Sequence, residues 1–560
     1  MSDTFDIAII GSGIAGASLA AILARHGKRV LVLEAKTHPR FAIGESMILE
    51  TSETLRALAT LYDVPELAYY SSENFLPIVG NSHGIKRHFS FLHHSENEPL
   101  NFNRSFQAVI PKQPHGHELH VYRQDSDYFL TSIAISYGAT VKQNTPVNDI
   151  TITDKCVTIK TDHKAFKADF IVDSGGYKSI IAEKFKLRDY DLQTHSRGIF
   201  THMIDVPSFH DGAASEKEFG FPYPLTEGTL HHVFDGGWLW VIPFNNHKKS
   251  TNPLCSVGLM LDPRKHPENK NLSPRDEFFS FIKRFPDIER QFCGTKSVRQ
   301  WTRSGRIQYS STKLIGKRFA LLGHAAGFVD PLFSKGMYAS LSCVGQLATP
   351  LLDNNKDYPV ENFKVYEERT KAFIKSHDRL VANSYKSFQN HKLWSVYLIL
   401  WLLGAYMEFV KLMNCRIESK TYTEYTAKTK DLHLVGGNFI EFDHLAEKID
   451  EIITEVDPLN GPDVNKAVAN IKALFAATDW LPDAFVQALK GKNHLPKNKI
   501  RWSLLHKKSG FMHHGDYRKH FFGDHKKITL IKTFMNEKQK YSETTLTNGY
   551  RHSLNIKGRF

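Results

Sequence analysis

The first thirty-four residues alternate between short apolar runs and turn residues. Residues 7–10 (Ile-Ala-Ile-Ile) form a continuous apolar run, which is typical of a strand buried on both faces of a parallel sheet. Residues 17–26 are rich in Ala and Leu and predict a helix, which Gly27 ends. Residues 29–34 predict a second strand, so this segment predicts a βαβ unit.

Later segments predict two kinds of sheet. The apolar runs at 170–173 and 318–323 predict further strands of the first, parallel sheet. Between them, residues near 196–206 and 228–262 alternate and are rich in aromatic and β-branched side chains, which predicts antiparallel strands. We therefore predict an α/β fold in which a nucleotide-binding domain is interrupted by a second sheet.

Beyond about residue 340 the pattern becomes helical. Leu445, Ile449 and Ile453 repeat at helical spacing, and Pro458 stops the run. The most apolar segment, 393–407, is about fifteen residues long, short of the roughly 20 needed to span a bilayer. A buried helix is the main expectation there, with an interfacial helix as the alternative and no transmembrane segment.

Length and charge set limits on function. The chain has 560 residues and a formal net charge of +13, with basic clusters at 490–492, 497–499 and 507–508. These clusters indicate either a solvated tail or a docking surface for an acidic protein. No nucleic-acid module accompanies them, so nucleic acid is not an expected partner.

Cysteine usage and the N-terminus indicate a compartment. The five cysteines are an odd number without a Cys-x-x-Cys pair, which favours free thiols in a reducing environment. The chain enters its first strand without the pattern of a signal peptide. Together these features predict a cytoplasmic protein.

A glycine-rich turn carries the first chemical signal. Gly11, Gly13 and Gly16 form G-x-G-x-x-G between the predicted strand and helix, where the helix N-terminus faces a pyrophosphate. Glu34 ends the second strand, where an acidic residue holds a ribose hydroxyl. The motif predicts a dinucleotide without a 2′-phosphate, either FAD or NAD.

Three later segments favour FAD. Residues 40–46 (Arg-Phe-Ala-Ile-Gly-Glu-Ser), 173–176 and 323–327 (Gly-His-Ala-Ala-Gly) follow in an order that resembles the flavin monooxygenases of the hydroxybenzoate hydroxylase type, over roughly the first 350 residues. Those proteins usually have Asp where this chain has His324. The resemblance implies a Rossmann-like FAD-binding domain, with cofactor contacts from Gly11, Gly13, Ile14, Ala15, Gly16, Glu34, Arg40, Ser46, Arg123, Gly323, His324 and Gly327.

Two further motifs narrow the class. Trp238-x-Trp240-x-Ile242-Pro243 and Phe328-x-x-Pro331-x-x-Ser334-x-Gly336 resemble the two signatures of flavin-dependent halogenases. The resemblance implies that a separate flavin reductase supplies FADH2, that oxygen forms a C4a-hydroperoxide, and that chloride or bromide attacks it to give hypohalous acid. It also implies a halide site at the N–H groups of Lys335 and Gly336. The residues implied to keep substrate from the flavin are Trp238, Trp240, Pro243 and Phe333.

The same resemblance implies a catalytic lysine. Residues 84–91 resemble the family's lysine segment, and Lys86 falls on the catalytic position, with Arg87 and His88 as its nearest substitutes. Such a lysine donates a hydrogen bond to hypohalous acid, or forms a haloamine if burial lowers its pKa.

Two departures refine the substrate. Phe333 stands where tryptophan halogenases have a glutamate, which favours the phenol- and pyrrole-type enzymes. The charge of Lys335 either attracts an anion or faces solvent. The histidines at 93, 94, 115 and 117 lack a carboxylate or cysteine at matching spacing, so we expect no metal.

These patterns predict residues 1–345 as an FAD-binding module, with an inserted antiparallel substrate sheet from about 80–110 and 190–300. Residues 346–560 are predicted as a helical region that covers the substrate. The predicted function is FADH2-dependent halogenation of an electron-rich aromatic, a phenol or pyrrole, either free or bound to a carrier protein. The alternatives are a flavin monooxygenase without a halide step and a non-catalytic flavin-binding partner subunit.

Overall fold

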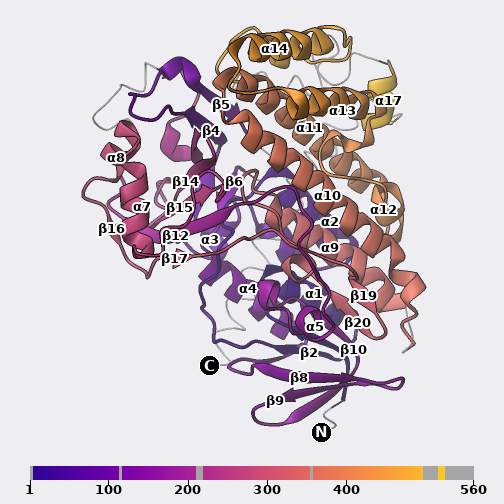
Figure 1. The fold of residues 1–560 in the computed structure, drawn as a ribbon. Helices are drawn as coiled ribbons and strands as arrows, with labels where there is room; N and C mark the ends of the chain where they lie inside the picture. Colours follow the sequence, from indigo (N-terminus) through magenta and orange to yellow (C-terminus); the bar gives the residue numbers. More distant parts are fainter. Residues whose placement is uncertain are drawn as a thin grey trace.

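The fold combines two large sheets and a layer of long helices (Figure 1). The computed structural model describes residues 4–112, 116–209, 219–353, 357–495, 515–523 and 536. The basic clusters at 497–499 and 507–508, and the histidine at 115, lie outside these residues. The prediction of an α/β Rossmann-like protein with a helical C-terminal region is confirmed.

The first sheet corresponds to the predicted parallel sheet of the nucleotide-binding domain. Its central strands are parallel and buried. Its path runs β19 (Ile315–Gly316), β20 (Phe319–Leu321), β10 (Ala165–Asp173), β1 (Thr4–Ile10), β2 (Val30–Leu33) and β7 (Thr140–Lys142). Strand β9 (Val157–Thr161) pairs with β10, and β8 (Val147–Ile152) pairs with β9. Strand β1 pairs in parallel with both β10 and β2. This places strands from distant parts of the chain side by side, with their carboxyl ends at one edge.

The second sheet lies beside the first. Its path runs β16 (Lys296–Ser297), β12 (Arg197–Ile204), β15 (Cys255–Leu261), β14 (Gly237–Pro243), β13 (Thr229–Phe234), β4 (His88–His93) and β5 (Ser105–Val109), with β17 (Thr302–Arg303) beside β12. The pairing of β13 with β4 is parallel, so the sheet is not purely antiparallel as predicted. These two strands are far apart in sequence, and no hairpin fixes their relative direction.

Two short ladders complete the strands. They are β11 (Arg188–Asp189) with β18 (Ser310–Ser311), and β3 (Gly84–Lys86) with β6 (Glu118–His120). The second ladder matters for function because it carries Lys86 in buried backbone.

The helices of the first half flank the sheets. They are α1 (Ile14–Arg25), α2 (Leu49–Leu61), α3 (Phe75–Ile78), α4 (Arg123–Ser136), α5 (Ile180–Lys184), α7 (Pro274–Ile282) and α8 (Pro286–Phe292). The later helices form the layer at one side of Figure 1. They are α9 (Lys335–Asp353), α10 (Lys364–Ser387), α11 (His391–Glu418), α12 (Tyr422–Thr429), α13 (Ile440–Glu455), α14 (Gly461–Ala476), α15 (Asp483–Leu489) and α17 (Gly515–Phe522).

Helix α11 is the core of the helical layer. It is longer than the fifteen-residue segment that the apolar run indicated, because buried polar residues such as Glu408 extend it. Its length and composition are sufficient to cross a membrane, but 89% of its most apolar window is buried inside the protein. The helix packs against α2, α10 and α14, as expected of a core helix.

Candidate active site

The glycine-rich turn between β1 and α1 builds an anion-binding loop. Gly11 has a φ of +88°, which favours glycine, and a Cβ on Gly16 would lie 2.1 Å from the carbonyl oxygen of Gly11. Helix α1 begins directly after Gly13 with no side-chain cap and no acidic residue in its first turn. The first N–H groups of α1, including those of Ile14 and Ala15, therefore have no acceptor within the helix, and such groups bind phosphate.

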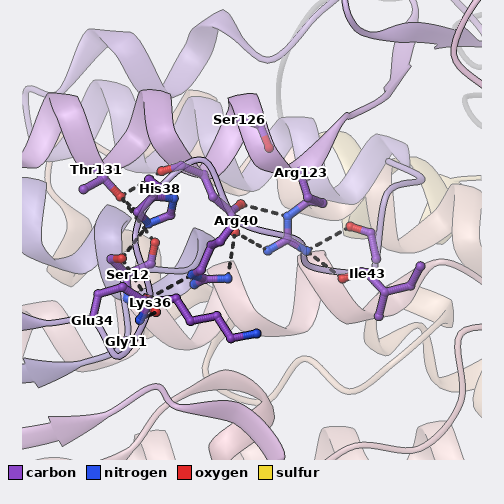
Figure 2. A network of polar contacts seen from close by, with 12 residues as sticks. Gly11, Ser12, Glu34, Lys36, His38, Arg40, Ile43, Arg123, Ser126 and Thr131 are labelled. Atoms are coloured by element: carbon purple, nitrogen blue, oxygen red, sulfur yellow. Dashed lines mark hydrogen bonds and ion pairs between the residues drawn. The ribbon is translucent and has the colours of Figure 1, made fainter. Parts of the chain in front are cut away.

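Glu34 anchors a polar network beside this loop (Figure 2). Its carboxylate accepts hydrogen bonds from the Ser12 amide at 3.0 Å and the Ser12 hydroxyl at 2.9 Å, and it pairs with Arg40 Nε at 3.1 Å. Burial raises the pKa of Glu34, but Arg40 and the hydrogen bonds outweigh it and leave the pKa lowered. A charged Glu34 therefore lies next to the loop, where a ribose would bind.

Arg123 ties the segment 40–46 to helix α4. Its guanidinium pairs with Asp127 at 2.8 Å and donates to the carbonyl oxygens of Ile43 and Gly44, as Figure 2 shows for Ile43. Arg40 approaches the same Asp127 at 3.9 Å. The structure therefore brings together the predicted residues Glu34, Arg40 and Arg123.

The segment 323–327 follows β20 and lies against α9. A Cβ on Gly323 would meet Ser340 at 2.9 Å and Ala15 at 3.6 Å, so this turn approaches α1 closely. Gly327 is also crowded, because its Cβ would meet Ile374 at 2.6 Å. Burial lowers the pKa of His324 to about 4. A neutral imidazole therefore stands where related monooxygenases usually have an aspartate.

Lys86 lies at the centre of the predicted catalytic region. Its side chain is fully buried, and its Nζ donates to Ser46 Oγ at 2.7 Å and to Ser334 Oγ at 3.3 Å. The Nζ also lies 3.4 Å from the centroid of the Phe89 ring. Burial lowers the pKa of Lys86 well below its usual value, although the carboxylates of Glu118 and Glu50 oppose this.

Ser46 was predicted at the flavin, and its hydroxyl lies between Lys86 and Thr229 Oγ1, 2.9 Å from the latter. Arg87 and His88, the alternatives to Lys86, are otherwise engaged. Arg87 pairs with Glu227 at 2.7 Å, and the His88 ring lies 2.8 Å from the carbonyl oxygen of Pro224.

The second signature ends at the N-terminus of α9. Ser334 has a φ of +56°, and α9 starts at the next residue, so the Lys335 and Gly336 amides belong to the first turn. Such N–H groups have no acceptor within the helix and attract anions. Because Ser334 also contacts Lys86, this helix end and the lysine lie next to each other.

The Lys335 side chain contradicts both expectations for its charge. It neither faces solvent nor is free to attract an anion, because its Nζ pairs with Glu50 at 2.5 Å and with Glu408 at 3.0 Å. Burial lowers the pKa of Lys335, but these two carboxylates outweigh it and raise the pKa. No local pattern indicated this triad, since its members come from α2, α9 and α11.

A small apolar cavity of about 30 Å³ is lined by Phe89, whose ring Lys86 contacts. Phe333 and Trp401 form one wall, with their rings stacked at 4.4 Å, and Phe89 crosses Trp401 edge-on at 5.2 Å. Glu50 and Lys335 add polar atoms to the lining. Trp401 is a functional candidate that the sequence analysis missed, because it lies more than sixty residues beyond the recognised motifs.

The tryptophan signature lies on β14, in the middle of the second sheet. Trp238 Nε1 donates to Tyr385 Oη at 3.1 Å, and Trp240 Nε1 donates to Ser256 Oγ at 3.1 Å. Tyr385 in turn lies 3.1 Å from Asp330, inside the second signature. Hydrogen bonds therefore connect the two signatures, which the sequence separates by about ninety residues.

Pro243 ends β14 close to the lysine ladder. Its carbonyl oxygen lies 2.9 Å from the His120 ring, and a Cβ on Gly84 would lie 2.6 Å from it. Glu118, opposite Lys86 in the ladder, is another residue that the sequence analysis missed. Burial raises its pKa to about 7, and its Oε1 accepts from Ser52 at 2.8 Å.

Metal binding finds no support in the part of the chain that the structure describes, where no group of three or more His, Cys, Asp or Glu side chains is arranged to hold an ion. A nucleotide loop, a buried lysine and an aromatic cavity are instead the arrangement of a flavin-dependent oxidoreductase.

Comparisons with known proteins identify the family. A NAD(P)-binding Rossmann-like pattern matches residues 9–46, and the tryptophan halogenase pattern matches residues 101–416. The tetracycline 7-halogenase of Kitasatospora aureofaciens is 36% identical over 85% of this chain and 87% of its own length. The monodechloroaminopyrrolnitrin halogenase PrnC of Pseudomonas fluorescens is 37% identical over 86% of this chain and 87% of its own.

A solved structure supports the same assignment. Halogenase PltM in complex with phloroglucinol and FAD superimposes with a TM-score of 0.83 and is 32% identical, covering 88% of this chain and 99% of PltM. The chain belongs to the flavin-dependent halogenases. It is an oxidoreductase that uses FAD and a halide, and enzymes of this family need a reductase to supply FADH2.

The residues present fit FAD. The uncapped N-terminus of α1 and the turn at Gly11 would hold the pyrophosphate. A Cβ on Gly13 would meet Arg40 Nη2 at 3.5 Å and Asp127 Oδ2 at 4.0 Å. Glu34 would bind the ribose, and the crowded turn at Gly323 lies against Ala15 on the same side. When bound in its reduced form, the flavin would supply the two electrons that reduce oxygen.

Proposed function

We propose that this enzyme halogenates a small electron-rich aromatic, a phenol or a pyrrole, in the cavity walled by Phe89, Phe333 and Trp401. The observation that carries the proposal is the position of Lys86. Its Nζ contacts Ser334 on one side and the Phe89 ring on the other. The lysine therefore connects the proposed halide loop to the proposed substrate cavity.

Lys86 suits the transfer of an electrophilic halogen. Its lowered pKa leaves a larger neutral fraction than an exposed lysine has, and a neutral amine is a nucleophile. A protonated Lys86 would instead donate a hydrogen bond to the oxygen of hypohalous acid. In either form, Ser46 and Ser334 hold the Nζ in place.

The cavity favours a flat, neutral substrate. Its walls are aromatic and aliphatic, and Phe333 stands where a glutamate would add charge. An electron-rich ring attacks an electrophilic halogen without such help. Relatives act on comparable rings by name, including a 1H-pyrrole-2-carbonyl-[peptidyl-carrier protein] chlorinase that is 24% identical, so the substrate is either free or carrier-bound.

Trp238, Trp240 and Pro243 are proposed to keep the substrate away from the flavin. Their support is the hydrogen-bonded connection from Trp238 through Tyr385 to Asp330, which holds the central sheet against the second signature. We also propose a cytoplasmic location, and a division into a flavin module at 1–345 and a substrate-covering region at 346–560.

A coupled assay tests the proposal. Purified enzyme is incubated with FAD, a flavin reductase, NADH, oxygen, bromide and a panel of phenols and pyrroles, and products are identified by mass spectrometry. Brominated product supports the proposal. Hydroxylated product that forms equally without halide would favour a monooxygenase, and flavin binding without any product would favour a non-catalytic subunit.

A further inference from the structure

A second cavity lies between α9 and α10, behind the segment 323–327. Its volume is about 40 Å³, and its lining includes the predicted flavin contacts Gly323, His324 and Gly327 but no residue of the glycine-rich loop at 11–16. His324 forms the wall towards the halide loop, since its Nε2 lies 3.1 Å from where a Cβ on Gly336 would stand. The cavity therefore adjoins both the predicted flavin site and the proposed halide site.

Arg369 places a positive charge at this cavity. It is only 7% exposed, and its Nη1 has one long hydrogen bond, 3.4 Å to Thr429 Oγ1. Across the described ranges no carboxylate lies within ion-pairing distance of its guanidinium. A buried charge is costly unless it is paired, so the cavity lacks a negative partner.

The neighbouring side chains do not provide that partner. Burial raises the pKa values of Cys343, Tyr422 and Tyr425, which therefore remain neutral near pH 7. The carboxylates of Glu50 and Glu408 pair with Lys335, and neither forms an ion pair with Arg369 within the described residues. The charge of Arg369 is left for a ligand.

Gln346 gives a second, independent indication. Its side chain is 5% exposed and lines the cavity, and neither its Oε1 nor its Nε2 has a hydrogen-bond partner within the described part of the chain. Buried polar groups are normally satisfied, so these atoms indicate a missing occupant.

We propose that this cavity binds a monovalent halide ion, chloride or bromide, held by the Arg369 guanidinium and the Gln346 amide N–H₂. A single negative charge matches the single guanidinium, whereas a phosphate would bring more charge than the cavity balances. A halide also needs few donors, which suits a lining completed by Ala339, Phe373 and Ile374. This binding does not depend on the proposed function.

Halide-dependent stability of the flavin-free, full-length protein tests the proposal. Melting temperatures are titrated with sodium bromide against sodium gluconate at constant ionic strength. Bromide is expected to raise Tm of the wild type by roughly 1–2 °C. In Arg369→Met and Gln346→Leu the apparent Kd for bromide is expected to weaken at least about tenfold.

Lys86→Met is the matched control, because it removes a buried cation elsewhere. It is expected to retain the bromide shift while it loses halogenation, so failure of the halide site and failure of the proposed function are separate results. An Arg369→Met protein that keeps the full bromide affinity would overturn the proposal.

Crystals of the wild type in bromide give a second measurement that needs no variant. An anomalous peak between Arg369 and Gln346 would support the site even if Arg369→Met does not fold. Water or no density there, with bromide only at the N-terminus of α9, would refute it.

Discussion

Two buried lysines lie near the aromatic cavity, and their surroundings differ: Lys335 is in its lining, and Lys86 contacts the Phe89 ring that lines it. Lys335 lies between the carboxylates of Glu50 and Glu408, which raise its pKa. Lys86 has serine hydroxyls and a phenyl ring as its contacts, and burial lowers its pKa. The paired lysine stabilises the junction of three helices, whereas the unpaired lysine is available for chemistry.

Burial alone does not define the role of a lysine. Desolvation disfavours the charge at both positions, and the neighbouring carboxylates decide the outcome. A strongly perturbed group beside a cavity is a functional candidate, while a satisfied ion pair is structural. Variants of these lysines and their neighbours distinguish a catalytic role for Lys86 from a structural role for Lys335.

Lys86→Met is expected to reduce halogenated product by about 10³-fold, because a positioned proton donor or nucleophile is lost. Flavin binding, measured by fluorescence quenching, is expected to remain within about twofold of the wild type. The amount of brominated product formed with a flavin reductase and bromide is measured for the variant and the wild type. The neighbouring Arg87→Met is the control, and equal losses in both variants would contradict a specific role for Lys86.

Lys335→Met is expected to lower the free energy of unfolding by about 3–5 kcal/mol, because Glu50 and Glu408 would remain buried without a cation. Urea denaturation at pH 7.5 measures the change. Lys371→Met removes a half-exposed partner of Glu367 and is expected to cost less than about 1 kcal/mol. A similar loss of stability in both variants would contradict the prediction that Glu50 and Glu408 need the Lys335 charge.

Acid is expected to weaken the region around Lys86 more than the triad. Burial lowers the pKa of His88 and of His120 from the ordinary value of 6.5 to about 3. The unfolded chain then binds more protons, so stability is present above pH 6.5 and is lost as pH falls towards 3. Each histidine is expected to cost about 2 kcal/mol between pH 7.5 and pH 5.

Urea midpoints at these two pH values measure this loss, and His120→Gln is expected to reduce the difference. His433 serves as the contrasting residue, since its hydrogen bond to Asp443 raises its pKa. An unchanged pH dependence in His120→Gln would mean that this histidine does not titrate on unfolding.

Phe333→Leu is expected to raise KM for the aromatic substrate about fivefold with little change in kcat, because about 1 kcal/mol of aromatic contact is lost. Steady-state kinetics on the best substrate of the panel measure it. Phe91→Leu is the control, since Phe91 also packs against Trp401 but does not line the cavity. An equal KM change in Phe91→Leu would place the substrate elsewhere.

Local sequence patterns predicted the nucleotide-binding part well. The turn at Gly11 and the strand ending at Glu34 depend on neighbouring residues, so their geometry follows from order along the chain. The family assignment and the FAD requirement are confirmed, while the individual site roles of Lys86, Trp238 and Gly336 remain predictions. The direction of β13 beside β4 was predicted wrongly, because no local turn determines it.

The sequence alone determined the class of cofactor and the family, because glycine spacing and the two signatures are local features. Which lysine forms ion pairs depends on the tertiary structure. Glu50, Lys335 and Glu408 are separated by 285 and 73 positions, and only the packing of α2, α9 and α11 brings them together. Lys86, by contrast, has no carboxylate within ion-pairing distance among the described residues. That difference arises from packing and desolvation, which no local pattern encodes.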